Sequence, residues 1–401
     1  MAQHIQEATL LLHFDVNKTL IINDAAAGKS MDDLINQIVM SGIWGQVINE
    51  NDKLKFIISD CGFRSTAPQT SEMKLIDYYG FVQDILHPYP KYDESVSLED
   101  RRKNNAIIKN TRTQIVKNFL KTDIGKNYTE EAAKLKMALL RPSSKLHGVT
   151  IETATQADFV NIVPAFFSCL FELCDRRRNF QLIIRTFGDM SDIESVIDEI
   201  NTFCQGKHID YPLNNEQLEF FSKKQIHLEK HQTIGHMYRN SKDTCYFVSD
   251  TLAFKPEMLQ FKPIEEMNLP ENNVISGFEK IYENIIENSS SGETRVIRDF
   301  YYWWNANNEQ TFAGKVFLIS EKDTEHFQIF FDDNVCSSTE FPIKGIVDLR
   351  SIETGESLDQ TKYLGRYIVN AYALDFLNNP RYYIEKIDQA EKHAVRVPTE
   401  Q

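Results

Sequence analysis

The sequence predicts an α/β protein in which a parallel β-sheet forms the core and two large insertions fold over it. Three short apolar runs indicate strands that are buried on both faces, and each run leads into polar residues. These runs are residues 9–14, 180–185 and 327–331. Helical segments with capping signals separate the runs, and this alternation of strand and helix favours right-handed βαβ connections.

Helix starts are indicated by residues that cap the first turn. A Ser, Thr or Asn that is followed three residues later by an acidic residue, or directly by Pro, is typical of an N-cap. Such signals occur at Ser30, Ser97, Thr155, Ser191 and Asn379. We expect the Thr155 helix to run to about Cys174 and the Ser191 helix to about Phe203. A further strand is expected at residues 344–349.

The core is expected to come from three separated parts of the chain, residues 1–30, 151–205 and 301–401. The stretch 31–150 carries mostly helical patterns, and the stretch 206–300 is mixed α/β and rich in aromatic residues. Connections of this length carry structure of their own, because loops in compact domains are much shorter. We therefore expect a mostly helical first cap and a mixed α/β second cap, both inserted over one sheet.

The composition is that of a globular protein and argues against two classes of partner. Hydrophobic residues make up 42% of the 401 residues, and 44 Lys and Arg against 58 Asp and Glu give a net charge of −14. This charge repels nucleic acids and anionic membranes, so neither is expected as a partner. The six cysteines show no CxxC spacing, and we expect reduced thiols in a cytoplasmic protein. The sequence leaves the oligomeric state open.

Complementary polar side chains follow the three predicted strands. Asp15 follows the first strand, Thr186 the second, and Asp332 and Asp333 the third. Ligands bind beyond the carboxyl ends of parallel strands, so these residues are expected to meet at one edge of the sheet. A carboxylate can attack phosphorus, and carboxylates are the ligands that Mg²⁺ prefers. Because neighbouring strand residues alternate sides, Asp332 and Asp333 are expected to contribute unequally to one metal site.

The residues at these strand ends resemble the motifs of the haloacid dehalogenase (HAD) superfamily. The segment from Asp15 to Thr19, Asp-Val-Asn-Lys-Thr, resembles the first motif, which is usually Asp-x-Asp-x-Thr after an apolar strand. Thr186 is similar to the second motif, a Thr or Ser that ends the next strand. Asp332 and Asp333 match the fourth motif, in which an apolar strand ends in paired acids. The resemblance covers only the core, roughly residues 1–30, 155–205 and 310–390, and leaves the insertions without a match.

The third motif of the superfamily is a lone Lys or Arg upstream of the fourth, and Lys315 fits it best, with Lys322 as the second choice. The resemblance implies a HAD-like Rossmannoid core in which Asp15 is the nucleophile of a Mg²⁺ site. The metal ligands that it implies are Asp15, the backbone carbonyl of Asn17, Asp332 as the direct ligand and Asp333 as the outer-shell partner. The residues that it implies for binding the transferred group are Thr19, Thr186 and Lys315.

Asn17 departs from the first motif in a way that bears on activity. Phosphatases of the superfamily carry a second Asp here as general acid and base, and an amide cannot donate and retake a proton in that way. We expect a Mg²⁺-dependent phosphatase or phosphotransferase that acts on a small phosphorylated substrate through an aspartyl-phosphate. The alternative is a HAD-fold protein that binds a phosphorylated ligand or a protein partner without turnover. Carbon–halogen cleavage is a weaker alternative, because it leaves the paired acids unexplained.

Overall fold

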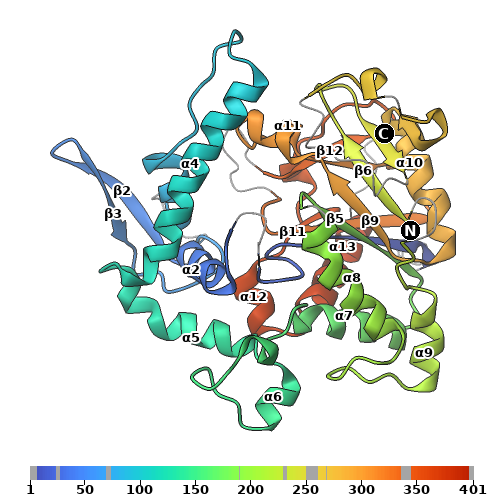
Figure 1. The fold of residues 1–401 in the computed structure, drawn as a ribbon, viewed down its shortest axis with the longest axis horizontal. Helices are drawn as coiled ribbons and strands as arrows, with labels where there is room; N and C mark the ends of the chain where they lie inside the picture. Colours follow the sequence, from blue (N-terminus) through green and yellow to red (C-terminus); the bar gives the residue numbers. More distant parts are fainter. Residues whose placement is uncertain are drawn as a thin grey trace.

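The computed structural model describes residues 7–23, 28–68, 74–188, 190–228, 233–249, 261–267, 269–335 and 345–396. Within these residues the central β-sheet consists of β1 (Thr9–Asp15), β5 (Phe180–Thr186), β6 (Ile234–Tyr238), β7 (Tyr246–Ser249), β8 (Val274–Ser276), β9 (Arg295–Asp299), β11 (His326–Asp332) and β13 (Ile368–Asn370). The strand order is β13-β11-β1-β5-β9-β6-β7-β8 (Figure 1). The strands from β13 to β6 are parallel, and β7 and β8 extend the sheet with antiparallel pairing.

The three strands predicted from apolar runs lie side by side as β11, β1 and β5 in the parallel part of the sheet. Every residue of β5 is buried, and so is every residue of β1 and β11 except the first. Strands that are covered on both faces can be apolar along their whole length, which is the pattern in the sequence. The expected α/β class and the mostly parallel core are confirmed.

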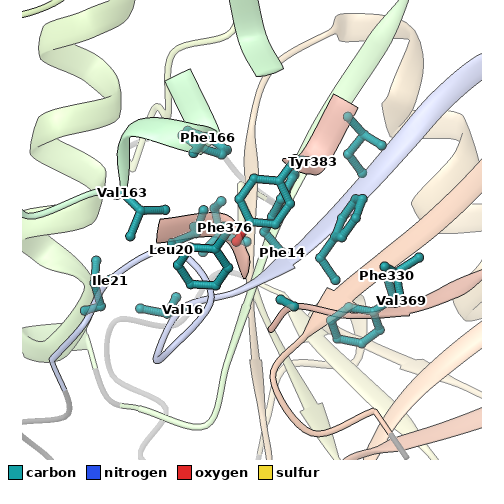
Figure 2. Packing of buried hydrophobic residues seen from close by; sticks show 14 of the residues in the cluster. Phe14, Val16, Leu20, Ile21, Val163, Phe166, Phe330, Val369, Phe376 and Tyr383 are labelled. Carbon is teal, nitrogen blue, oxygen red and sulfur yellow. The ribbon is translucent and has the colours of Figure 1, made fainter. Parts of the chain in front are cut away.

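The two faces of the sheet are covered by different structures. One face packs on α7 (Pro164–Asp175), α8 (Met190–Cys204) and α13 (Tyr382–Arg396). Leu12 and Phe14 of β1 point to this face, and Figure 2 shows Phe14 close to Phe166 and Tyr383. Leu11 points to the other face. That face packs on α10 (Phe278–Glu287) and on β10 (Lys315–Ile319), which forms a separate parallel pair with β12 (Val347–Ser351).

Residues 31–150 form a lobe beside the sheet, named the cap lobe below (Figure 1). It contains α2 (Met31–Ser41), α3 (Tyr78–Gly80), α4 (Leu98–Asn118), α5 (Thr129–Ala138), α6 (Pro142–Leu146) and an antiparallel sheet of β2 (Trp44–Glu50), β3 (Lys53–Ile58) and β4 (Ile76–Asp77). The Ser30 hydroxyl accepts a hydrogen bond from the Asp33 amide and caps α2. Ser97 caps α4 in the same way. Both helix starts agree with the capping signals in the sequence.

Residues 206–300 differ from the inserted second cap that the sequence suggested. They supply β6, β7, β8 and β9 to the central sheet, together with α9 (Asn215–Ser222) and α10. All of β6 is buried, although His236 interrupts its apolar run. All of β9 is buried as well, although it carries Arg295 and Arg298, which hydrogen-bond inside the protein. These polar residues conceal both strands from a search for apolar runs.

Other boundaries differ by smaller amounts. Thr155 caps a single 3-10 turn (Gln156–Asp158), and α7 begins only at Pro164 because that proline suits a first helical position. The helix expected from Ser191 is α8, which begins at Met190. The helix expected from Asn379 is α13, which begins at Tyr382. The remaining longer helices are α11 (Tyr301–Ala306) and α12 (Ala373–Asn378). The strand expected at residues 344–349 is β12, and residue 344 lies outside the described residues.

Two further sequence expectations concern cysteines and membranes. Five cysteines are free thiols in the structure: Cys61, Cys169, Cys174, Cys204 and Cys245. Cys336 lies outside the described residues. In the part of the chain that the structure describes, no helix combines the length and the apolar character needed to cross a bilayer.

Candidate functional site

Two carboxylates and one lysine meet at the edge of the sheet where β1 and β11 end. The Lys315 Nζ donates hydrogen bonds to Asp15 Oδ1 and to Asp332 Oδ2, the latter at 2.9 Å. β1 and β11 are parallel neighbours, with Phe14 opposite Phe331, so their last residues reach the same edge. The sheet therefore brings together side chains that are far apart in the sequence.

Lys315 reaches this edge because β10 crosses the face of the sheet that carries His13 and Asp15. These two β1 residues point to the same side, since side chains alternate along a strand. The His13 ring packs against Phe317 of β10 with 5.0 Å between ring centroids. Lys315 precedes Phe317 by two residues, so it shares that side of β10 and reaches Asp15. Lys322 lies beyond the opposite end of β10, so the geometry favours Lys315 for this site.

A third carboxylate, Asp333, joins the cluster from the turn after β11. One oxygen of each of Asp15, Asp332 and Asp333 lies within 4.8 Å of the others. β11 ends at Asp332, and Asp333 therefore lies after the strand. The alternation that was expected to place Asp332 and Asp333 on opposite sides holds only within a strand, so it does not separate them. Asp333 forms an ion pair with Lys18. Lys18 has a φ of 59°, a left-handed conformation that is uncommon for non-glycine residues and recurs at functional sites.

The electrostatics of the cluster follow from its burial. Burial raises the pKa of Asp15 well above its usual value, with help from Asp332 and Asp333 and against the opposing charge of Lys315. Burial and the charge of Asp333 likewise raise the pKa of Asp332. Burial alone would lower the pKa of Lys315, but the two adjacent carboxylates outweigh it and raise that pKa. The site therefore combines a protonated lysine with carboxylates that repel one another.

The three carboxylates could hold a metal ion. Their oxygens lie close together, and hard divalent cations prefer ligand sets made of oxygen atoms. Burial raises the pKa of Asp15 and of Asp332, and repulsion from the neighbouring carboxylates adds to both shifts. A bound cation would offset that repulsion, so the residues present fit a hard divalent metal.

A buried ion pair supports the cluster from the next two strands. Arg185 of β5 lies opposite Asp15 in the parallel register. Its guanidinium donates to both carboxylate oxygens of Asp299, at 2.9 and 2.6 Å, and to the Val316 carbonyl at 2.9 Å. Since Val316 follows Lys315 directly, the arginine fixes the start of β10 against the central sheet.

Thr186 and Thr19 lie near the same edge, but each is enclosed by the protein. The Thr186 hydroxyl accepts a hydrogen bond from the Gly188 amide at 2.9 Å, and strand alternation places this side chain opposite to that of Arg185. Thr19 is fully buried, and its hydroxyl has no hydrogen-bond partner among the described residues. Contact of either hydroxyl with a phosphoryl group stays a prediction.

A cavity of about 930 Å³ adjoins the cluster. Its lining on the core side includes Asp15, Asn17, Lys18 and Asp333, and its other walls include residues of the cap lobe and of α11. Sites for small molecules typically have volumes of about 300–1,000 Å³. The cluster is thus buried in the fold and still borders a space that a small ligand could fill.

Three residues that support the cluster were missed from the sequence: Lys18, Arg185 and Asp299. Lys18 lies inside the segment that resembles the first motif, where its charge close to Asp15 was an available signal. Asp299 ends β9 as Asp332 ends β11, but the two arginines of β9 concealed that strand. Arg185 was read only as part of an apolar run, although a charge in such a run requires a buried partner.

Comparison with known proteins identifies no relative of this chain. No protein-family model matches it, and neither does any curated protein or solved structure. The function is therefore argued from the site itself.

Proposed function

We propose that this protein is a Mg²⁺-dependent phosphatase or phosphotransferase of the HAD type, which acts on a small phosphorylated substrate through an aspartyl-phosphate at Asp15. The observation that carries the proposal is the buried Lys315 Nζ, which donates to Asp332 and to Asp15, the residue of this group that lines the cavity. A carboxylate that attacks a phosphate dianion needs positive charge beside it, and preorganised charge is the main source of such catalysis.

The topology adds support for a HAD-like Rossmannoid core. β11, β1 and β5 are parallel neighbours, and they carry the paired acids, Asp15 and Thr186 at their carboxyl ends. Lys315 comes from a different strand and still reaches the same point. Four segments that resemble separate motifs of one superfamily thus converge at the sheet edge where ligands of α/β proteins bind.

In the first step, a carboxylate oxygen of Asp15 attacks the phosphorus atom, and the bond between phosphorus and the leaving-group oxygen breaks. The electron pair of that bond stays with the leaving oxygen, which takes a proton from water. Lys315 holds its positive charge beside the phosphoryl oxygens. When bound, Mg²⁺ offsets the charge of those oxygens. Its ligands would be Asp15, the backbone carbonyl of Asn17, Asp332 directly and Asp333 in the outer shell.

In the second step, a water molecule attacks the phosphorus atom of the aspartyl-phosphate. The bond between phosphorus and the Asp15 oxygen breaks, inorganic phosphate leaves with the oxygen of water, and the released proton passes to solvent. In a phosphotransferase an acceptor hydroxyl takes the place of water. Asn17 offers no base for this step, so the covalent intermediate should persist longer than in an Asp-x-Asp enzyme.

The test compares the wild-type protein with Asp15→Asn on acetyl phosphate and 4-nitrophenyl phosphate, with Mg²⁺ and with a chelator. We expect Mg²⁺-dependent phosphate release by the wild type and a loss of about 10⁴-fold or more in the variant, since it lacks the nucleophile. Asp123→Asn is the matched control, because the Asp123 side chain is fully exposed, and it should keep the activity. Full activity of Asp15→Asn would contradict the proposal.

Asn17 favours a second candidate, a protein that binds a phosphorylated ligand without turnover. This candidate predicts that calorimetry detects a phosphate analogue bound in the presence of Mg²⁺ while no phosphate ester is hydrolysed. Turnover that depends on Asp15 would exclude it.

A further inference from the structure

Aromatic side chains line two sides of the cavity that borders Asp15. From the core side these are Phe187, Tyr301 and Trp304, and from the cap lobe they are Trp44 and Tyr79. Rings on two walls of a ligand-sized cavity are the usual means of holding a planar, apolar group. The arrangement of these rings relative to the charged cluster indicates where such a group would sit.

The core wall begins directly beside Lys315. Its Nζ lies 5.1 Å from the centroid of the Phe187 ring. Phe187 stacks on Trp304, with 5.2 Å between centroids and 21° between ring planes, and it meets Tyr301 edge-on at 5.7 Å. A continuous aromatic surface therefore leads away from the lysine that contacts Asp15.

The cap wall contains Tyr79, a partly buried residue that packs against the hydrophobic core and also lines the cavity. Its neighbour Tyr78 packs inside the cap lobe against Phe56 and Phe119, with centroid distances of 5.0 and 5.2 Å, and does not line the cavity. Lys18, which is ion-paired with Asp333 of the charged cluster, lines the same cavity as Tyr79. The cap wall and the charged cluster therefore border one cavity.

Trp44 comes from the same corner of the cap lobe. It lies opposite Asp77 in the pairing of β2 with β4, two residues before Tyr79. Its indole Nε1 donates to the Arg64 carbonyl at 2.9 Å, which fixes the orientation of the ring. Trp44 and Tyr79 both line the cavity, so both rings can contact a ligand that occupies it.

We propose that the substrate of this site is a phosphate monoester of an aromatic group, with the phosphoryl group at Asp15 and the ring between the Phe187 wall and the Tyr79 wall. The inference rests on the proposed function, because it names the substrate class of the same site. An aromatic alcohol whose oxygen is bonded to the ring leaves as a phenolate, which needs little protonation, and this matches the absence of an acid at Asn17.

The test measures recognition of the ring without relying on turnover. Benzylphosphonate and cyclohexylmethylphosphonate cannot be hydrolysed, carry the same phosphonate group and differ in whether the ring is aromatic. We expect calorimetry with Mg²⁺ to find benzylphosphonate bound about fivefold to tenfold more tightly, because aromatic pairs add to simple apolar burial. Equal affinities, or tighter binding of the saturated compound, would overturn the inference.

Substitutions of Tyr79 test whether this ring causes the preference for benzylphosphonate. Tyr79→Leu should reduce the preference for benzylphosphonate to less than about twofold, and Tyr79→Phe should preserve it, because the ring and not the hydroxyl makes the contact. Tyr128→Leu is the control, since Tyr128 is a half-buried tyrosine of the cap lobe that packs on Phe63 and does not line the cavity. An undiminished preference in Tyr79→Leu would overturn the placement of the ring.

Failure of the proposed function and failure of this inference give different results. If the proposed function is wrong, acetyl phosphate, which has no ring to recognise, shows no turnover that depends on Asp15. If the inference is wrong, the protein binds the two phosphonates with equal affinity. A clear preference for benzylphosphonate supports the aromatic ligand class whether or not acetyl phosphate is hydrolysed.

Discussion

The protein contains two clusters of buried charges that differ in composition and in access. The first, the site cluster, consists of Asp15, Lys315 and Asp332 with the adjoining Asp333. The second, the arginine cluster, consists of Arg239, Asp348 and Arg350 at the β10–β12 pair. Except for Asp333, which is partly exposed, the side chains of both clusters are almost completely excluded from solvent, so burial alone does not distinguish them.

The arginine cluster is held together by hydrogen bonds within the fold. One Asp348 oxygen accepts from Arg239 at 2.8 Å and from Arg350 at 2.7 Å, and the other accepts from the Ser357 hydroxyl at 2.7 Å. Both arginines also donate to the Lys242 carbonyl. No residue of this cluster lines the cavity described above. Its hydrogen bonds join β12 to the loop after β6, so its role is structural.

The site cluster differs in its access. Asp15 and Asp333 line the cavity, and burial together with repulsion between carboxylates raises the pKa values of Asp15 and Asp332. The comparison indicates that buried charges bordering a cavity serve function, whereas buried charges whose hydrogen bonds close within the fold serve stability. The predictions below test this distinction.

The largest expected effect is on stability. Asp348→Ala leaves two buried guanidinium groups without a carboxylate, and we expect a loss of about 3–5 kcal/mol in the free energy of unfolding. Asp332→Ala should cost less than about 1 kcal/mol without metal, because Lys315 keeps Asp15 as a partner and one repelling charge is removed. Urea unfolding of both variants without Mg²⁺ measures the difference. Equal losses would contradict the comparison.

The next effect concerns Mg²⁺ affinity, which should depend on the site cluster alone. Loss of an outer-shell partner typically weakens metal binding by about 10- to 100-fold, which we expect for Asp333→Ala. Asp332→Ala should weaken binding further, because it removes the proposed direct ligand. Titration calorimetry gives both values, with Asp123→Asn as the control. Full retention of Mg²⁺ binding in both variants would refute the metal site.

The smallest expected effect concerns Asn17. Asn17→Asp introduces a possible acid and base, and such assistance typically contributes about 10²–10⁴-fold when the leaving group needs a proton. We expect turnover of alkyl phosphates to rise by at least about tenfold and that of aryl phosphates to change less, because a phenolate leaves readily. Steady-state kinetics measures the turnover of both substrate classes by the wild-type protein and by the variant. An equal loss for both classes would mean that Asn17 itself supports the reaction.

The strands that carry the site could be predicted because β1, β5 and β11 are covered on both faces and are therefore apolar along their length. The meeting of Asp15 and Asp332 follows from parallel pairing alone. Lys315 was found by resemblance, since no local pattern shows that β10 crosses the sheet and delivers its first residue to Asp15.

Other parts of the structure depend on tertiary contacts that a local pattern does not contain. β6 and β9 carry polar residues that find partners only in the folded protein, so residues 206–300 looked like an insertion. The residues that line the cavity likewise come together only through tertiary contacts. Tyr78 and Tyr79 are adjacent and identical in type, yet Tyr79 lines the cavity and Tyr78 does not, and this difference depends on the packing of the cap lobe.

The covalent state of Asp15 tests the central claim most directly. The wild-type protein is incubated with acetyl phosphate and Mg²⁺, quenched in acid and analysed by peptide mass spectrometry. We expect a phosphate group on the peptide that contains Asp15, stable enough to detect because Asn17 provides no base for its hydrolysis, and no such group in Asp15→Asn. Mg²⁺-dependent turnover by a wild-type protein that carries no phosphate at Asp15, or phosphate at another residue in its place, would contradict the account.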